Sequence, residues 1–472
     1  MAKRGFSSTF DQSYSRRTLL GNAAKLGAGL TAVSLAGPTM ANRALAQQTE
    51  IQFMGWGSPL EEQNVEKAMQ TFESQHPDIK VDWIHVPNAD YPTKINTAMA
   101  GGNAPDVYWG SNMADYVALG VAMDVTSRIQ SDPTIGKSDY FLEPQEMGRA
   151  TINGKWYGIG SCWVAHHLYY NKKLLEAAGI EPPSYDATKA WSWDQYLDIA
   201  RKLTMDSSGK HPEEDGFNAD NIQQYGVYWE NWSLPRDVLV YSNGGEAYTD
   251  DYTCHLNAPE AIEAYQALAD LTIKHHVAPQ AATFQQLGMA NAWEALASGK
   301  VAILTDGSWA LQDISKLNFE FGCGVLPMMK TAVTEAQAHV HMIYKDTKKA
   351  DAAWQLLAFL ASDDYQRGLV QAGLWLPSHT SLMTPDGIQS WLTEGVHPEG
   401  YEQIATDYLA KHAKNYFYPA GFSDADALIV AALDPVWTGD QSAEEAIANS
   451  GVIDQVNDLL KEKKAKLDKS TA

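Results

Sequence analysis

The stretch NGKWYGIGSCWVAHHLYYNKK, from Asn153 to Lys173, marks the point at which the chain leaves one α/β unit and enters another. It starts with Asn153-Gly154, a pair that readily adopts the positive φ angles of a two-residue hairpin turn. The residues from Trp156 to Ile159 predict a short apolar strand, and a second apolar run leads to a helix that starts at Asn171. We therefore expect the chain to pass through a hinge here, with a separate domain on each side.

Length, composition and charge agree with an organisation in at least two domains. At 472 residues the chain is too long for a single hydrophobic core. Its content of 45% hydrophobic and 20% charged residues is that of an ordinary soluble protein, and the sequence has no apolar run long enough for a membrane-spanning helix. The formal net charge of −23 argues against nucleic acid or an anionic membrane surface as a partner, because both select clustered Lys and Arg.

Residues 1–46 have the features of a twin-arginine signal peptide. Arg16-Arg17 precede a weakly apolar stretch rich in Ala and Gly, and the small-residue site Ala44-Leu45-Ala46 closes it. Lys25 interrupts the apolar stretch, which suits the twin-arginine route better than the general secretory one; an ordinary amphipathic helix is the alternative. No cysteine follows the site, which argues against a lipid anchor. Cleavage would leave 29 basic and 57 acidic residues, a net charge of −28, on an exported periplasmic protein.

The cysteines, histidines and acidic residues give little support to a metal or cofactor. Cys162, Cys254 and Cys323 are widely spaced, and three buried free thiols are expected, with one disulfide plus a free thiol as the alternative. The adjacent histidine pairs lack a third ligand at a diagnostic spacing. The polar segment 206–221 has five acidic residues but no EF-hand pattern, so we expect a solvated surface loop rather than a calcium site.

From residue 50 onwards the pattern alternates between strands and helices. We expect strands over 51–54, 79–86 and 104–110, joined by helices over 61–74 and from 90 to about 100. Such alternation implies a mostly parallel sheet with helices on both faces, and ligands bind beyond the carboxyl ends of its strands. After residue 173 we expect strands over 225–232, 301–304 and 321–326 and helices over 193–203, 258–275, 350–362, 365–372 and 443–466.

Taken in order, these pieces resemble the extracellular solute-binding proteins of ABC importers, in the large family typified by maltose-binding protein. The resemblance covers almost the whole chain after residue 46. Each motif alone is weakly specific, and their order and spacing carry the resemblance. The motifs are Gly55 to Gly57 after a strand, Asp90-Tyr91, Gly102 to Val107, Asn153 to Gly158, Tyr169 to Lys172, Trp191 to Asp194, Ser298 to Ala302, Asp306 to Trp309, Gly373 to Pro377 and Ser442 to Ala446.

The resemblance implies a two-lobed α/β fold of the periplasmic binding protein type II, which closes over its ligand by a hinge movement. By analogy, 47–161 and 336–374 form the first lobe, and 162–335 and 375–472 form the second. A member of this family is a monomer without a cofactor that delivers its ligand to the permease subunits of an ABC transporter in the inner membrane. A chemosensory or adhesion receptor without a transporter would use the same fold and pocket.

A carbohydrate site needs aromatic rings for the C–H faces of the sugar and carboxylates, amides or Arg for its hydroxyls. Trp109 and Trp309 match positions at which maltose-type proteins place stacking aromatics, and Phe422 matches a further aromatic loop of theirs. Asp106 follows a proline at the start of a predicted strand and is either a ligand contact or a structural cap, and the same alternatives hold for Asp90. The other candidates lie in predicted strand-end or hinge loops; they are Trp56, Trp163, Trp229, Glu230, Asp306 and Trp375. For every tryptophan the alternative is packing beneath its own loop, and Trp83, Trp354 and Trp437 are expected in the core.

The alternatives to a sugar receptor are a different ligand and an enzymatic activity. A polyol or phosphorylated polyol is the nearest alternative ligand, although a phosphate would favour Arg, and few arginines lie near the candidate loops. The chain has no GxSxG, P-loop, HExxH or GxGxxG motif, which argues against an enzyme. Paired carboxylates of a secreted glycosidase would be distant in sequence and would leave no motif, so that possibility stays open at this stage.

Overall fold

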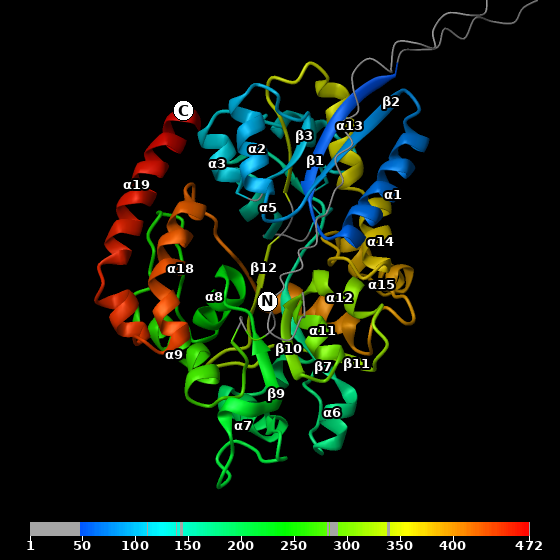
Figure 1. Cartoon of the computed structure of the whole chain (residues 1–472). Helices are drawn as coiled ribbons and strands as arrows, with labels where there is room; N and C mark the ends of the chain where they lie inside the picture. The colour runs from blue at the N-terminus through cyan, green and yellow to red at the C-terminus, as the bar shows by residue number, and fades with distance from the viewer. Residues whose placement is uncertain are drawn as a thin grey trace, which may run out of the picture. The chain divides into compact units, whose positions relative to one another are not determined.

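Two mixed β-sheets organise the chain from residue 48 onwards (Figure 1). The computed structural model describes residues 48–471 apart from 111, 138, 142–144, 281–282, 284–290 and 338–339, and it describes 145–147 by backbone alone. The contacts of the chain divide it at Ala46 and Gln47, where the predicted signal peptide ends. That peptide lies outside the described residues. No helix among the described residues is long and apolar enough to cross a membrane.

The first sheet has the strand order β2-β1-β3-β13-β6. Its first three strands are β1 (Thr49–Trp56), β2 (Ile79–Val86) and β3 (Val107–Gly110), and β1 pairs in parallel with both of the others, as predicted. The connecting helices are α1 (Pro59–Gln75) and α2 (Tyr91–Ala100). A capping box fixes the start of α1, because Ser58 accepts from the Glu61 backbone N–H and the Glu61 carboxylate accepts from that of Ser58.

The other two strands of this sheet are β13 (Val340–Ile343) and β6 (Ile159–Gly160). Strand β13 pairs antiparallel with both β3 and β6, so β6 runs in the same direction as β1, β2 and β3, and β13 runs against these four. The chain reaches β13 after leaving and re-entering the sheet rather than through a crossover helix, which permits the reversed direction. The predicted hairpin turn is confirmed: Asn153 and Gly154 have φ angles of 52° and 74° between β4 (Thr151–Ile152) and β5 (Lys155–Trp156).

The second sheet has the strand order β11-β7-β10-β9-β8, and only β9 and β10 pair in parallel. Its strands are β7 (His166–Asn171), β8 (Met205–Asp206), β9 (Ile222–Trp229), β10 (Val301–Gly307) and β11 (Phe321–Gly324). Every residue of the central strand β10 is buried. The predicted strand over 225–232 ends three residues early, because Ser233 already begins the helix α8 (Ser233–Ser242).

Helices cover the sheets and connect them. Helix α13 (Ala350–Leu360) packs on β13, α7 (Trp193–Leu203) packs on β9, and α19 (Val452–Thr471) packs against α3 (Met113–Ala118) and α18 (Phe422–Thr438) (Figure 1). The predicted helix over 443–466 is interrupted at Gly451, whose φ is 76°, so α19 starts only at Val452. The remaining helices include α4 (Thr126–Ser131), α5 (Gln145–Ala150), α6 (Lys172–Ala177), α9 (Pro259–Ile273), α11 (Ala292–Ala297), α12 (Leu311–Ile314), α14 (Asp363–Gln371), α15 (Pro385–Trp391), α16 (Tyr401–Gln403) and α17 (Leu409–His412).

A two-stranded parallel ribbon connects residues that are far apart in the sequence. Strand β12 (Thr334–Ala336) pairs with β14 (Ala413–Asn415), and α8 packs against β12. The short 3₁₀ and π segments are Ala187–Lys189, Ala219–Asn221, Ser308–Ala310, Thr380–Met383, Ile404–Tyr408 and Glu444–Ala448.

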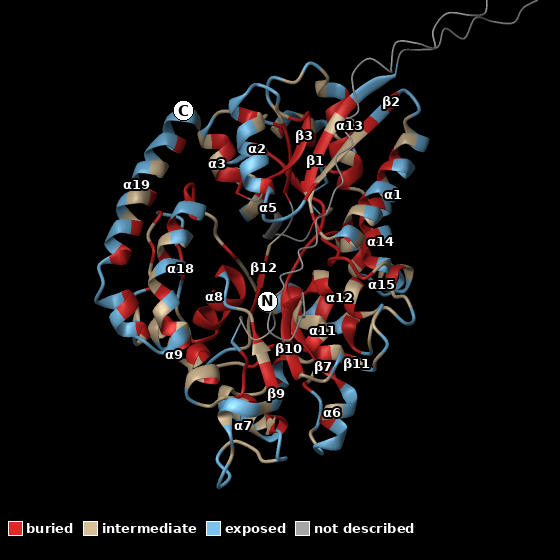
Figure 2. Cartoon of the chain, in the orientation of Figure 1, coloured by how far each residue is buried: buried red, intermediate tan, exposed pale blue. Residues whose placement is uncertain are grey.

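Burial follows the sheets, with exposed residues on the outer faces of α1, α6 and α19 (Figure 2). All three cysteines are buried and free, which confirms the prediction. Burial raises the pKa of Cys254 to about 12, so its thiol stays protonated. In the loop 206–221, the Asp206 carboxylate accepts hydrogen bonds from the backbone N–H groups of Ser208, Lys210 and Asn218. This loop is therefore organised by one carboxylate and backbone donors.

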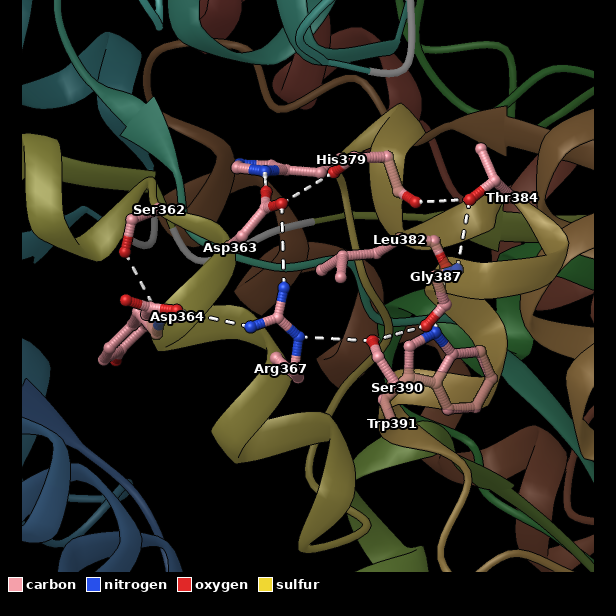
Figure 3. A network of polar contacts seen from close by, with 12 residues as sticks. Ser362, Asp363, Asp364, Arg367, His379, Leu382, Thr384, Gly387, Ser390 and Trp391 are labelled. Carbon is pink, nitrogen blue, oxygen red and sulfur yellow. Dashed lines mark hydrogen bonds and ion pairs between the residues drawn. The ribbon is translucent and has the colours of Figure 1, made fainter.

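A polar network joins α14 to the segment that follows it (Figure 3). Arg367 donates to Ser390 Oγ at 3.2 Å and pairs with Asp364 at 3.3 Å, and the buried His379 contacts Asp363. The hydrogen bond to His379 is the largest cause of the lowered pKa of Asp363, so this carboxylate stays ionised beside the ring. The network fixes the position of α15 relative to α14.

Candidate functional site

A cavity of about 530 Å³ lies where segments following strands of both sheets come together. Trp56 ends β1 of the first sheet, whereas Glu230 follows β9 and Trp309 follows β10 of the second sheet. We call this space the tryptophan cavity. Its described lining residues are Trp56, Ser58, Glu61, Asn88, Pro92, Asn112, Glu230, Trp232, Ser233, Leu234, Trp293, Trp309, Gln312, Asp313, Gln337, Trp375, Tyr418, Phe422 and Ser423.

Indole rings form much of the wall. Trp232 and Trp309 lie with ring centroids 6.0 Å apart and planes at 43°. Trp56 and Trp375 each pack edge-on against the buried Trp109, at 4.9 Å and 5.6 Å. The cavity therefore has flat apolar faces held in place by a second layer of aromatic rings.

Trp375 has an unusual backbone conformation. Its φ is 69°, in the left-handed region that bulky residues rarely adopt and that costs on the order of 1–3 kcal/mol. The next residue, Leu376, exchanges two backbone hydrogen bonds of 2.8 Å with Trp163, and these hold the strained segment in place. Such conformations are concentrated at ligand-binding sites, where the position of one side chain matters more than local strain.

Three carboxylates line the cavity, and a fourth is buried nearby. Burial raises the pKa of Glu61 to about 8, the Ser58 backbone N–H opposes this, and Asp313 adds to it. Burial also raises the pKa of Asp313 and of Glu230, and at Glu230 the indole N–H of Trp232, which donates at 2.7 Å, acts in the opposite direction. Asp306 is buried beneath the wall, and burial together with the charge of Glu230 keeps its pKa far above the ordinary range.

Hydrogen bonds cross the rim of the cavity between elements that belong with different sheets. Gln312 in α12, which follows β10, donates to Ser58 Oγ at 3.4 Å and accepts from Asn64 of α1 at 3.2 Å. On another side, Asn112 donates to the Pro419 carbonyl at 3.0 Å. The two sides of the cavity are thus in direct contact in this conformation.

Five of the ten predicted site residues line the cavity: Trp56, Glu230, Trp309, Trp375 and Phe422. The other five do not line it. Trp109 is fully buried behind Trp56, and Trp163 is buried under the Arg149 guanidinium, which lies 4.4 Å from its ring. Trp229 is buried and donates to the Pro235 carbonyl, and Asp306 accepts from the Gly307 backbone N–H. Asp90 is exposed and precedes α2 without making a capping hydrogen bond.

Several lining residues were absent from the prediction. Glu61 reads in the sequence as part of a capping box, and Gln312 and Asp313 belong to a four-residue helix with no motif. Trp232 lies in a loop recognised as aromatic, but Trp229 was chosen from it instead. Successive side chains of a strand point to opposite faces, but this rule tells which of the two tryptophans turns inward only when the last residue of β9 is known. Trp293 begins a short helix and carried no signal.

The chain belongs to the bacterial extracellular solute-binding protein family, whose model matches residues 57–367. A binding protein of Brucella abortus is 24% identical over 325 residues, which cover 66% of this chain and 72% of that protein. The sn-glycerol-3-phosphate-binding periplasmic protein of Agrobacterium fabrum is 29% identical over 161 residues, but this covers only 34% of the chain and 33% of the relative.

Solved structures of similar proteins share the fold. An ABC substrate-binding protein of Listeria monocytogenes in complex with cycloalternan has a TM-score of 0.75 and 23% identity, over 87% of this chain and 98% of the other. The GacH receptor of Streptomyces glaucescens, solved unliganded and with acarbose, has a TM-score of 0.71 and 21% identity, over 88% and 99%. The fold is therefore the two-lobed maltose-binding-like fold that the sequence predicts.

Proposed function

We propose that this protein is a periplasmic receptor that captures a mono- or small oligosaccharide and delivers it to an ABC importer. The tryptophan cavity carries this proposal, because flat indole faces suit the C–H faces of a sugar, and carboxylates and amides suit its hydroxyls. Its volume of about 530 Å³ lies within the range of small-molecule sites. Similar folds in the receptors that bind cycloalternan and acarbose support the same ligand class.

The receptor works by closing its two lobes on the ligand. We assign 47–161 and 336–374 to one lobe and 162–335 and 375–472 to the other. This is supported by the fact that each of the two five-stranded sheets draws all its strands from one of these groups. A sugar that contacts Trp56 on one side and Trp309 on the other has more contacts in the closed state. That difference in affinity shifts the population towards closure, which the transporter can read.

The route to the periplasm and the assembly state are part of the same proposal. The twin-arginine signal predicted over 1–46 would export the folded protein, which would act as a soluble monomer beside the permease. The ligand would leave unchanged, since a receptor binds it without catalysis.

A phosphorylated polyol is the alternative ligand, because the Agrobacterium relative is an sn-glycerol-3-phosphate-binding protein. Phosphate recognition favours Arg or Lys. Among the described residues that line the tryptophan cavity there is no Arg, Lys or His, and three carboxylates are present. Sugars without a phosphate fit this wall better.

Trp309→Ala is expected to weaken sugar binding about 30-fold, since truncating a central aromatic residue of a binding site typically costs about 2 kcal/mol. The affected sugar is first found by a thermal-shift screen of sugars, polyols, amino acids and peptides, and its affinity is measured by calorimetry. Recovery of the intact sugar after incubation separates a receptor from a glycosidase.

Trp354→Ala is the matched control, because Trp354 lies on α13, away from the cavity, and it should leave the affinity unchanged. Hits only among amino acids or peptides would retain the fold and reject the sugar. Consumption of the hit would reject the receptor role.

Gly307→Ala is expected to lower the affinity for the same sugar about tenfold without adding backbone strain. A Cβ atom at Gly307 would lie 2.2 Å from a ring atom of Trp309, so the indole must move out of its place in the wall. Gly307 has a φ of −82°, which alanine adopts freely. Gly368→Ala is the control, since no atom lies within 4 Å of the added Cβ; an equal loss of affinity in both variants would contradict the proposed role of Trp309.

A further inference from the structure

The charged groups among the described residues that line the tryptophan cavity are all carboxylates. Glu61, Glu230 and Asp313 line it, and the described lining residues include no cationic side chain. The internal positions outside the described residues contain no Lys or Arg in the sequence. The three carboxylates therefore face the space with no cation of the lining to balance them.

One carboxylate oxygen of Glu61 lacks a hydrogen-bond donor among the described residues. Its side chain belongs to a residue only 7% exposed, and Oε2 accepts from the Ser58 backbone N–H at 3.3 Å. Oε1 is buried and has no hydrogen-bond partner among the described residues. Gly57, with a φ of 154°, allows the backbone to press on this carboxylate, because a Cβ there would lie 2.5 Å from Glu61 Cδ. A buried acceptor without a donor in a ligand cavity is a candidate contact for the ligand.

The neighbouring carboxylates add to this deficit. Asp313 raises the pKa of Glu61 further, and the Asp313 carboxylate makes no hydrogen bond or ion pair with the described residues. Glu230 receives one hydrogen bond, from the Trp232 indole N–H at 2.7 Å. Buried carboxylates are ordinarily balanced by a cation or kept neutral by a proton. A cationic ligand would supply the balance that the chain lacks.

The surrounding rings suit the same group. Trp56, Trp309 and Trp375 line the cavity together with the carboxylates, and the face of an indole attracts an ammonium group. An aromatic wall with carboxylates behind it is therefore complementary to a sugar ring that carries a positive charge.

We propose that the ligand is an amino sugar, whose protonated amine is held by Glu61 and Asp313 while its ring lies against the tryptophans. This rests on the proposed function, because it specifies the class of carbohydrate. Acidic sugars and sugar phosphates are excluded by the same carboxylates. A small amine without a sugar ring would satisfy the charge but leave the indole faces uncovered.

The test uses matched ligand sets that differ at one carbon only, which carries a hydroxyl, an amine or an N-acetylamine. The sets are built on glucose, on galactose, and on α-linked and β-linked glucose oligosaccharides, with ethanolamine as the primary amine without a ring. Affinities are measured by calorimetry at pH 7. We expect the tightest binder to be an amine, about tenfold tighter than its hydroxyl and N-acetyl partners, because a charge-assisted hydrogen bond is stronger than a neutral one.

Glu61→Gln locates the effect. The substitution keeps the shape of the side chain but prevents it from ionising against a bound ammonium group. It should therefore weaken binding of the amine about tenfold and change binding of the hydroxyl partner less than about threefold. Glu66→Gln on the exposed face of α1 is the matched control and should change neither.

The outcomes separate the two proposals. A hydroxyl or N-acetyl sugar that binds as tightly as its amine, or an equal effect of Glu61→Gln on both, overturns the amino-sugar inference and leaves the carbohydrate receptor standing. Tightest binding of ethanolamine overturns the inference and the sugar together. Binding of no member of any set by the folded protein also overturns both.

Discussion

Arg236→Ala is expected to lower the free energy of unfolding by about 3–5 kcal/mol, because it leaves a buried carboxylate without its cation. The Arg236 side chain is fully buried in α8, donates to both oxygens of Asp237 at 2.7 Å and 3.3 Å, and pairs with Asp426 of α18 at 3.0 Å. Asp237 also accepts from the hydroxyls of Tyr265 and Tyr416 at 2.7 Å and 2.6 Å. The midpoint of urea unfolding, followed by tryptophan fluorescence, measures the loss.

Two further variants decide whether the buried charge is the cause. Arg236→Lys keeps the cation but loses the forked geometry of the guanidinium, so its free energy of unfolding should lie between those of the wild type and Arg236→Ala. Arg367→Ala removes a partly exposed arginine from the network of Figure 3, and it should cost no more than about 1 kcal/mol. Equal losses at positions 236 and 367 would mean that the Arg236 network contributes no more than a surface ion pair.

This buried network also bears on the tryptophan cavity. Helix α8 starts with Ser233 and Leu234, and α18 starts with Phe422, all of which line the cavity. The ion pair between Arg236 and Asp426 joins these two helices one turn from their starts. We therefore regard the network as the support that keeps one wall of the cavity in place.

Features that depend on local sequence could be predicted. Helix α7 spans Trp193–Leu203 as expected, since Ser192 and Gln195 form a capping box at its start. The turn at Asn153-Gly154 likewise follows from residues that tolerate positive φ. The parallel pairing of β1, β2 and β3 follows from short strand–helix–strand repeats, whose geometry allows few alternatives.

Features that depend on the path of the whole chain could not be predicted from the sequence. Helix α8 is buried on every side, so it has no amphipathic period, and Pro235 obscures its first turn. Strand β13 pairs antiparallel with β3 although the two strands are more than a hundred residues apart in the sequence. Nothing local distinguishes it from another parallel strand.

The wall of the tryptophan cavity was predicted at the level of loops rather than side chains. Trp229 is the last residue of β9 and packs against Trp193 at 5.8 Å, whereas Trp232, three residues later, reaches the cavity. The loop was recognised from its composition, but which indole turns inward depends on where the strand ends. Glu61 was missed for a related reason, because its helix-capping role explains the residue fully from the sequence alone.

Glu61→Gln is expected to stabilise the ligand-free protein increasingly as the pH rises from 5 to 8. Burial raises the pKa of Glu61 to about 8 from an ordinary 4.5, and Asp313 of α12 adds to the rise while the Ser58 N–H opposes it. Below pH 4.5 both the folded and unfolded states hold the proton. Between pH 4.5 and 8 the unfolded chain releases it and the folded chain does not, so the wild type loses stability with increasing pH until the folded carboxyl also ionises. The difference between variant and wild type should grow by on the order of 4 kcal/mol across this window.

Urea unfolding of both proteins at several pH values measures this difference and removes the general effect of the large net charge, which both share. Glu66→Gln, at an exposed position on α1, is the control and should change the stability at pH 7 little. A flat difference for Glu61→Gln would mean that Glu61 ionises normally in the empty cavity. A protonated amine bound to Glu61 should favour its ionised form, because a nearby opposite charge stabilises the carboxylate. In that case the wild type with a bound amino sugar should lose less stability than the empty protein as the pH rises from 5 to 8.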